Sequence, residues 1–552
     1  MGRSGRRRSG YPCPHEPRQL GPCGGGAVNP FAGMNLASLL EARASERGTH
    51  PLLVWAPLEG PPRTWSYAGF AAEVASVAGG LLRRGVRPGD RVLVQLENCP
   101  EALMVLFACA RIGAVHVPVN AMAAGPELAW YASFTQAVGA VTQPRLAATL
   151  AAHCPTLGWL VVTDTDAGEA PAPGAAPGEP FATLAGPPAP LRAPDPWADA
   201  LVMFTSGTTS RPKGVLWTQG NALWGARTGA LQQALRADDV VQLFLPLFHV
   251  VALAWTFLPS LWAGATVVLQ PRFSATRYWP VALAHGATTG SQVMFTLGIL
   301  RRQPVPPGHR FRQWITAQCP PGLERHFGVP RILGAWSMTE VITQVIVGDP
   351  WQPQPAGSIG RPSNAYAVHV RDEDGRPLQG PGTGALLVGG IRGLSLFKEY
   401  FRDPQATAEA FDAQGLFRTG DRVTVDAAGF IHFADRARDV IKVGGESVSP
   451  AEIERVLQEL AFIREAAVVG RPEATYGEVP FAFVVLAPDH QGMPGADVAQ
   501  QAIAHCAAAL ARFKVPRTVV VVADLPRVNF GKVAKTRLRE MAHAQFSKGD
   551  TT

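Results

Sequence analysis

The chain has 552 residues, a formal net charge of +7 and 47% hydrophobic residues. This length corresponds to about three or four domain-sized units, and the apolar content suffices for several cores, which excludes a disordered or fibrous protein. Residues 1–33 carry five arginines and one glutamate, so more than half of the net charge belongs to this short segment. The rest has no basic stripe with interleaved aromatic residues, so we expect no nucleic-acid partner.

The cysteines and the N-terminal segment give information on the cellular location of the protein. Seven scattered cysteines form no C-x-x-C pair, which argues against a disulfide framework and a zinc site and favours a reducing, cytoplasmic location. Residues 1–33 lack the apolar core of a secretory signal. We expect them to be a disordered tail or to lie upstream of a start at Met34. A mitochondrial transit peptide is the alternative, but the glycines at 24–26 and several prolines oppose an amphipathic helix.

Helix and strand patterns alternate from Asn35 onward. Residues 35–47 have an amphipathic helical pattern, residues 91–97 and 114–120 read as strands, and residues 100–113 between these strands read as a helix. Such alternation predicts parallel sheets covered by helices. Residues 164–196 are rich in Pro, Ala and Gly, which predicts a surface loop or linker.

One apolar stretch imitates a membrane span. Residues 240–271 contain no charged residue, but Pro246, His249, Pro259 and Gly264 interrupt them. The stretch divides into a strand, a buried helix and a second strand, each shorter than a bilayer requires. We therefore interpret it as the core of an α/β domain and expect no membrane span.

The character of the sequence changes near Asp435. Beyond it, residues 465–470, 480–488 and 518–526 read as short strands, and residues 497–510 as a helix. The predicted fold is therefore α/β, with a large N-terminal domain of parallel or mixed sheets packed with helices. A small α+β C-terminal domain completes it. The expected boundaries are 34–435 for the first domain and 436–545 for the second.

A glycine- and hydroxyl-rich segment, TSGTTSRPKGV at 205–215, follows the apolar strand at 198–204. Glycines let the backbone approach an anion, hydroxyls and amides donate to its oxygens, and Lys213 adds a positive charge. The segment lacks the spacing of a Walker A loop. A polar turn without function is the alternative, but this ordered string after a strand favours phosphate binding.

The string at 205–215 resembles the signature of adenylate-forming enzymes, which include acyl-CoA synthetases, luciferases and nonribosomal-peptide adenylation domains. The resemblance extends from about residue 35 to 540 through further motifs in the family's order: LPLFHV (245–250), GAWSMTE (334–340), GSIGRP (357–362), GLFRTGD (415–421), DRARDVIKVGGESVSPAEIE (435–454), ARFKVPR (511–517) and LPRVNFGKVAKTRLR (525–539). LENCPE (96–101) and FKEYFRDPQATAEAF (397–411) look most like bacterial crotonobetaine/carnitine-CoA ligases.

This resemblance implies an AMP-forming acid-thiol ligase with ATP, Mg²⁺ and CoA. A carboxylate would attack the α-phosphate of ATP to give acyl-AMP and pyrophosphate, and the thiol of CoA would then displace AMP. Both halves are mainly problems of charge and positioning. The implied partners are small molecules, and the protein is expected to be a monomer or homodimer.

The resemblance also assigns the ATP site. The β- and γ-phosphates would be wrapped by Thr205, Ser206, Gly207, Thr208, Thr209 and Lys213. Trp336 would lie against adenine beside Ser337, where the family usually has Tyr and Gly. A core aromatic is the alternative for Trp336, but the Thr339–Glu340 pair that follows it favours the adenine site.

Four further residues complete this implied site. Thr339 would donate to the α-phosphate and Glu340 would hold Mg²⁺, for which carboxylate oxygen is a suitable ligand. Asp421 would accept both ribose hydroxyls, with Arg436 beside the ribose. The alternatives are a surface role for Glu340 and a simple turn for Asp421.

The C-terminal domain would be mobile, as in the family, and would present two faces in turn. Lys532 would bridge the substrate carboxylate and the α-phosphate during adenylation. After rotation at the hinge residue Arg438, Lys442 would approach the acyl-AMP and Gly444 and Gly445 would line the CoA tunnel.

His249 would sit where the acyl pocket meets the thiol tunnel, to orient substrate or gate the pantetheine arm. It need not act as a base, because a thiolate can form without one. A satisfied core histidine is an equal alternative.

The acyl group stays open in the sequence. A trimethylammonium acid would require an aromatic cage or an acidic group, and Trp255, Trp262 and Trp279 are available, although their spacing fits core residues. The family's Gly-rich stretch before the Trp336 motif is shortened here and contains residues 317–320, Ala-Gln-Cys-Pro.

Three other functions remain open. The adenylate could be passed to an amine or a carrier-protein thiol, and luciferase-like oxidation has no specific support. A degenerate nucleotide- or acyl-binding pseudoenzyme is the third. Against it, the expected charged residues are all present: Lys213, Glu340, Asp421, Arg436 and Lys532.

Overall fold

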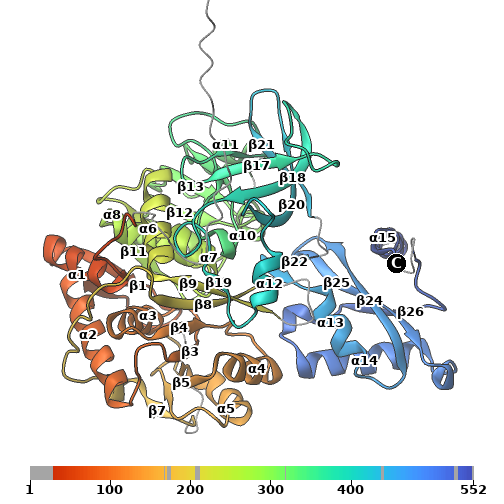
Figure 1. Ribbon diagram of the computed structural model, residues 1–552, viewed down its shortest axis with the longest axis horizontal. Helices are drawn as coiled ribbons and strands as arrows, with labels where there is room; N and C mark the ends of the chain where they lie inside the picture. Colours follow the sequence, from red (N-terminus) through yellow and green to blue (C-terminus); the bar gives the residue numbers. More distant parts are fainter. Residues whose placement is uncertain are drawn as a thin grey trace, which may run out of the picture.

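The computed structural model describes residues 29–166, 168–170, 176–205, 212–317, 319–436, 440–527 and 533–549. Two large sheets with their helices build an N-terminal α/β domain, and a third sheet builds a smaller C-terminal domain beside it (Figure 1). This is the fold class expected from the sequence.

The first sheet has eight strands in the order β19-β9-β8-β4-β3-β5-β6-β7, and all neighbours from β8 to β7 are parallel. The antiparallel hairpin β8–β9 flanks the segment expected to bind phosphate. The strands are β3 (Arg91–Gln95), β4 (Val115–Pro118), β5 (Ala137–Thr142), β6 (Leu160–Val162), β7 (Glu179–Pro180), β8 (Asp199–Thr205), β9 (Lys213–Thr218) and β19 (Glu399–Tyr400).

The second sheet has thirteen strands in the order β17-β18-β20-β21-β16-β15-β14-β13-β12-β10-β11-β1-β2. Its parallel centre runs from β14 to β1, and antiparallel strands extend both ends. The strands are β1 (Pro51–Trp55), β2 (Arg63–Ser66), β10 (Val240–Leu243), β11 (Thr266–Leu269), β12 (Thr289–Gln292), β13 (Gln313–Thr316), β14 (Ile332–Trp336), β15 (Ile346–Val347), β16 (Ser358–Pro362), β17 (Ala367–Arg371), β18 (Gly382–Gly389), β20 (Phe417–Val425) and β21 (Ile431–Arg436).

The helices of the N-terminal domain cover these sheets, and one core cluster joins side chains from both sheets. Local sequence sets their ends: α3 begins at a proline and stops before Gly113, whose left-handed backbone (φ 80°) caps it. The helices are α1 (Leu36–Arg47), α2 (Tyr67–Arg83), α3 (Pro100–Ile112), α4 (Gly125–Thr135), α5 (Pro144–His153), η1 (Phe181–Leu184), α6 (Gln219–Gln232), α7 (Val250–Ala252), η2 (Leu253–Phe257), α8 (Leu258–Ala263), α9 (Tyr278–His285), α10 (Met294–Leu300), α11 (Leu323–Phe327), η3 (Thr339–Val341) and α12 (Pro404–Glu409).

The C-terminal domain has a five-stranded sheet in the order β23-β22-β25-β24, with β26 parallel to β25. Apolar clusters cover both faces of this sheet. Its elements are β22 (Ile441–Val443), β23 (Glu446–Val448), α13 (Pro450–Leu457), β24 (Ile463–Glu473), β25 (Gly477–Leu486), η4 (Pro488–His490), α14 (Gly495–Ala509), η5 (Arg512–Lys514), β26 (Thr518–Val521) and α15 (Lys535–Gly549).

The uncharged stretch 240–271 folds as expected into a strand, a helical segment and a strand. The helical segment is less regular than expected, because α7 passes through the π-helical turn η2 before α8. Both strands are buried in the second sheet. Among the helices of the described part of the chain, none is both long and apolar enough to cross a membrane.

The folded unit starts before the expected boundary at Met34. Phe31 is 1% exposed, and its ring meets Trp262 edge-on with centroids 6.1 Å apart. Burial of a phenyl ring is favourable by about 2 kcal/mol, which explains why this residue belongs to the core. Trp255 and Trp279 are also buried core residues, as their spacing indicated.

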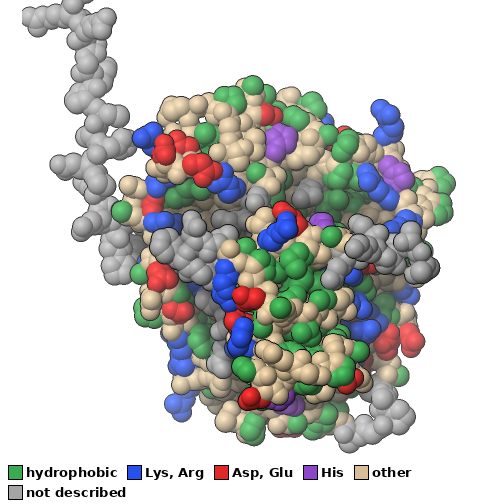
Figure 2. All heavy atoms as spheres, turned by 90° about the vertical axis from the view of Figure 1, so that its right-hand side faces the viewer, with side chains coloured by type: hydrophobic (Ala, Val, Ile, Leu, Met, Phe, Trp, Pro, Cys, Tyr) green, Lys and Arg blue, Asp and Glu red, His purple; other side chains and the backbone are tan. Residues whose placement is uncertain are grey.

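The surface of the C-terminal side carries mixed charge. Figure 2 faces this side, and basic and acidic side chains are interspersed across it around a central apolar area. Among the side chains of described residues, this face shows no basic stripe of the kind that a nucleic-acid groove needs.

Candidate active site

The hairpin β8–β9 places Thr205 and Lys213 opposite each other, because these residues are partners in its register. Ser206, Gly207, Thr208 and Thr209, which lie between them, are outside the described residues. The Lys213 ammonium lies 4.6 Å from the centroid of the Tyr400 ring, a cation–π contact. This contact fixes a positive charge at one end of the predicted phosphate segment.

Tyr400 connects Lys213 to Glu340. Its hydroxyl donates to Oε1 of Glu340 over 2.8 Å, and both residues are buried. Tyr400 belongs to β19, which pairs with β9 at the edge of the first sheet. The Lys213–Tyr400–Glu340 chain therefore joins the phosphate segment to the motif at 334–340. Sequence reasoning did not select Tyr400, and the string FKEYF was the only signal for it.

Thr339 and Glu340 lie on the short 3-10 turn η3, directly after β14. Trp217 on β9 donates its indole N–H to the Thr339 carbonyl over 2.9 Å, so the first sheet supports this turn. The turn ends at Ile342, a buried β-branched residue with φ 69°. Such a backbone costs of order 1–3 kcal/mol and is typical of active sites.

Trp336 and Asp421 form a buried pair at the carboxyl end of β14. The indole Nε1–H donates to Oδ2 of Asp421 over 2.9 Å, and the side chains come from strands 85 residues apart. Asp421 lies within β20, so the alternative of a simple turn residue is wrong. It stands opposite Arg436 in the register of β20 and β21. Ser337 follows Trp336, and its hydroxyl donates to the Met338 carbonyl over 3.3 Å.

A second group of predicted residues lies between the two domains. His249, in the loop before α7, has its Nε2 2.8 Å from Oε2 of Glu446 on β23. Burial alone would raise the pKa of Glu446, but the interaction and hydrogen bond with His249 and the charge of Lys442 lower it below its ordinary value. The carboxylate therefore stays ionised. Glu446 was not selected from the sequence, although it directly follows the Gly444–Gly445 pair.

Two glycines lie at the domain boundary, and one of them, Gly445, directly approaches the N-terminal domain. A Cβ at Gly445 (φ 96°) would stand 3.8 Å from the Val293 side chain, and one at Gly444 (φ 59°) would stand 3.2 Å from the Tyr476 ring. The rings of Phe295 and Tyr476 stack across the same boundary, with centroids 6.0 Å apart. Any larger residue at these glycines would also need a left-handed backbone.

Lys442 is exposed, and its ammonium donates to the Ser447 hydroxyl on the neighbouring strand. Its backbone N–H donates to Glu478 over 2.9 Å, which fixes β22 in place. Lys532 and Arg438 lie outside the described residues, so their roles stay predictions.

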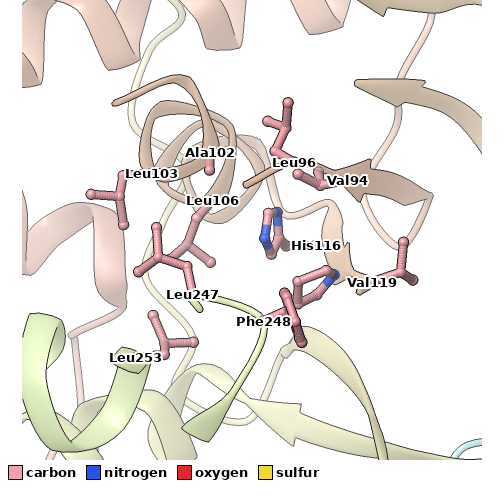
Figure 3. Close-up of a pocket in the computed structure, with 11 residues that line it drawn as sticks. Val94, Leu96, Ala102, Leu103, Leu106, His116, Val119, Leu247, Phe248 and Leu253 are labelled. Atoms are coloured by element: carbon pink, nitrogen blue, oxygen red, sulfur yellow. The ribbon is translucent and has the colours of Figure 1, made fainter. Parts of the chain in front are cut away.

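A separate small apolar cavity is lined in part by Leu247 and Phe248, which lie in the loop that carries His249 (Figure 3). Burial lowers the pKa of His116 to about 3, so its ring is neutral. Within the described residues its Nδ1 has no hydrogen-bond partner. None of the predicted site residues lines this cavity, whose walls are Val94, Leu96, Ala102, Leu103, Leu106, His116, Pro118, Val119, Leu247, Phe248 and Leu253.

No cluster of three or more metal-ligating side chains occurs in the portion of the chain that is described. A metal bound through one carboxylate and substrate phosphates does not need such a cluster.

Comparisons with known proteins agree with this architecture. Residues 40–401 match the family model of the AMP-binding enzyme, and residues 452–532 match that of the AMP-binding enzyme C-terminal domain. The crotonobetaine/carnitine–CoA ligase of Salmonella typhi is 33% identical over 525 residues, covering 92% of this chain and 99% of that protein.

Two solved structures show the same fold. A double mutant of o-succinylbenzoate CoA synthetase from Bacillus subtilis, bound to the product analogue OSB-NCoA, aligns with a TM-score of 0.78 and 26% identity. That alignment covers 91% of this chain and 98% of the synthetase. ATP-bound MatB from Rhodopseudomonas palustris aligns with a TM-score of 0.66 and 26% identity, over 92% and 99% of the two chains.

The fold and the family motifs together define an adenylate-forming enzyme. The chain belongs to the AMP-binding enzyme family and is an ATP-dependent, AMP-forming acid–CoA ligase. The resemblance stated from the motifs is thereby confirmed, while the roles of the individual site residues stay predictions.

Proposed function

We propose that this ligase forms the acyl-AMP in the N-terminal domain, between the Lys213–Tyr400–Glu340 chain and the Trp336–Asp421 pair. The observation that carries the proposal is the buried bond between Trp336 and Asp421 at the end of β14. It holds a carboxylate, the acceptor that a ribose diol needs, beside an aromatic face suited to adenine.

In this proposal the phosphates of ATP lie along Lys213 and the Thr205–Thr209 segment, and Thr339 donates to the α-phosphate. The Tyr400 hydroxyl fixes the orientation of Glu340, whose buried carboxylate fits the ligand preference of Mg²⁺. When bound, the ion would neutralise charge on the phosphates. Lys532 supplies the cation where the substrate carboxylate meets the α-phosphate.

The two domains bounded from the sequence at 34–435 and 436–545, the first of which also includes Phe31 in its core, act in turn, with Arg438 as the hinge. We propose that the described arrangement is the one for thioester formation. Gly445 and Glu446 face Val293 and His249 across the boundary, which supports this assignment. The alignment with the synthetase that carries a CoA product analogue also has a higher TM-score than that with ATP-bound MatB, 0.78 against 0.66.

The first acid to test is crotonobetaine, because the Salmonella typhi relative is named for it and for carnitine. The buried positions of Trp255 and Trp279 argue against these residues as a trimethylammonium cage. Short, aromatic and longer aliphatic acids therefore belong in the same panel. A cytoplasmic location is supported by the five described cysteines, which are all buried free thiols.

The test is ATP-dependent pyrophosphate release across this panel, with and without CoA. Release that depends on one acid class, with CoA completing a thioester, is the expected result. Release that CoA does not carry to a thioester would favour an amine or a carrier-protein thiol as acceptor. Absence of release with ATP still bound would favour the degenerate alternative.

A further inference from the structure

Three charged side chains are buried together where the two domains meet. Glu127 belongs to α4 of the N-terminal domain, whereas Glu452 on α13 and Lys514 on η5 belong to the C-terminal domain. The Lys514 ammonium donates to Oε1 of Glu127 and, over 2.9 Å, to Oε1 of Glu452. The three side chains are only 8%, 4% and 8% exposed for Glu127, Glu452 and Lys514. We call these residues the interdomain triad.

Glu127 holds the C-terminal domain at two points. Besides the Lys514 ammonium, it accepts the backbone N–H of Ala511 at Oε2 over 3.0 Å. The same oxygen accepts the N–H of Ala124, 2.8 Å away, at the start of its own helix. Helix α14 also contacts α4, so this corner is a packed part of the domain boundary (Figure 1).

The two glutamates of the triad are not equivalent partners for Lys514. Burial alone would lower the pKa of Lys514, but Tyr131, Glu452 and Glu127 raise it, so the ammonium stays charged. Burial raises the pKa of Glu452 more than Lys514 lowers it. In the described residues, Oε2 of Glu452 has no hydrogen-bond partner. Glu452 alone is therefore an incomplete partner for Lys514, and Glu127 supplies the remaining contact.

Because the three residues belong to two different domains, a rotation of the C-terminal domain would break only some of the contacts in the triad. If the C-terminal domain rotates, Lys514 and Glu452 move together and keep their bond. Glu127 stays behind and loses both Lys514 and Ala511. In the docked arrangement Lys514 is buried, and there its charge would be incompletely matched without Glu127, which is unfavourable. The Glu127 contact therefore favours the docked arrangement specifically.

We propose that Glu127 is a positioning residue, which sets the balance between the thioester-forming arrangement and the adenylating one. The proposal rests on the alternation of domains in the proposed function. Glu446 belongs to the same docked arrangement, since Lys514 contributes to its electrostatic environment and His249 is its direct partner. Loss of the Glu127 contact would therefore also loosen the contact of Glu446 with His249.

The variant that tests this is Glu127→Gln. Glutamine keeps the shape and one carbonyl acceptor for the helix start, so α4 should remain intact, but the charge on Lys514 is no longer matched across the boundary. We expect thioester formation from supplied acyl-AMP to slow roughly tenfold, while acyl-AMP formation is unchanged or faster. The acid is the one with the fastest pyrophosphate release in the panel above.

Glu452→Gln is the matched control. It removes a carboxylate from the same ammonium, but this pair lies within one domain and persists in both arrangements. It should change both half-reactions by the same factor. An equal loss of both half-reactions in Glu127→Gln would overturn the proposal.

Amide hydrogen exchange of the unliganded proteins gives a readout that does not need turnover. In Glu127→Gln, residues 510–515 should exchange faster, whereas amides of β24 and β25 inside the C-terminal domain should keep their protection. Unchanged exchange at 510–515 would overturn the proposal. If the parent enzyme activates no acid, the proposed function fails, and the exchange result still decides the role of Glu127.

Discussion

The two halves of the proposed site are built in different ways. The adenylate half, with Trp336–Asp421 and Lys213–Tyr400–Glu340, is closed by buried contacts within one domain. The thiol half depends on contacts across the boundary, chiefly His249–Glu446 and the approach of Gly445 to Val293. The first half is organised before the domains dock, whereas the second exists only in the docked arrangement. Variants should therefore separate the two half-reactions.

The largest difference between the effects on the two half-reactions is expected from Lys532→Ala. Loss of a cation that meets two anions should slow acyl-AMP formation by about 100-fold or more, while thioester formation from supplied acyl-AMP is largely spared. Separate assays of the two half-reactions measure this. Lys535→Ala, in the same string but paired with Glu454 over 2.8 Å, is the control and should spare both. Equal losses in both halves would remove Lys532 from adenylation.

The opposite effect, a selective loss of thioester formation, is expected from Glu446→Gln. The variant weakens the partly buried bond to His249, which should slow thioester formation about tenfold and leave acyl-AMP formation unchanged. A cycle with His249→Ala checks the assignment, because two residues acting through one contact should give non-additive effects. Additive losses would mean that the residues act independently.

A smaller effect within the adenylate half is expected from Trp336→Phe. The ring face remains, but the N–H bond to Asp421 is lost, so the KM for ATP should rise about fivefold, equivalent to about 1 kcal/mol. Trp314→Phe, at a buried indole whose Nε1 has no partner among the described residues, is the control. An unchanged KM in Trp336→Phe would show that this bond does not orient Asp421.

The smallest effect concerns stability near the apolar cavity. The folded pKa of His116, about 3, is below its ordinary value of 6.5. The part of the folding stability that depends on a neutral His116 is therefore lost as pH falls from 6.5 towards about 3. The reason is that the unfolded chain takes up the proton first. His116→Leu should be less sensitive to acid and more stable by about 1–2 kcal/mol. Denaturant unfolding at neutral and mildly acidic pH measures it; equal acid sensitivity in both proteins would contradict it.

Much of the fold could be predicted because local sequence sets it. The pattern of α3 between β3 and β4, and the apolar strands of the C-terminal sheet, required only periodicity and breakers. The packing of Phe31 ahead of residue 34 was not predicted, because a lone phenylalanine in a Gly/Pro-rich segment gives no periodic signal, and only its contact with Trp262 reveals it.

The candidate site, like the fold, could be predicted only in part from the sequence. Ordered motifs pointed to Trp336, Glu340 and Asp421, but their partners are set by tertiary structure. Tyr400 lies 60 residues from Glu340, and Glu446 lies 197 residues from His249. Single-sequence patterns contain no information on such pairs, so the links between motifs emerged only from the fold.

The Trp336–Asp421 bond also makes Trp336 a fluorescent reporter of the proposed adenylate site. An indole whose N–H faces a carboxylate emits differently from one in an apolar core, and Trp336 lies where a nucleotide base is proposed to stack. Subtracting the emission spectrum of Trp336→Phe from that of the parent would isolate this one chromophore. Its quenching on addition of ATP would then report occupancy of the adenylate half directly, without any coupled assay.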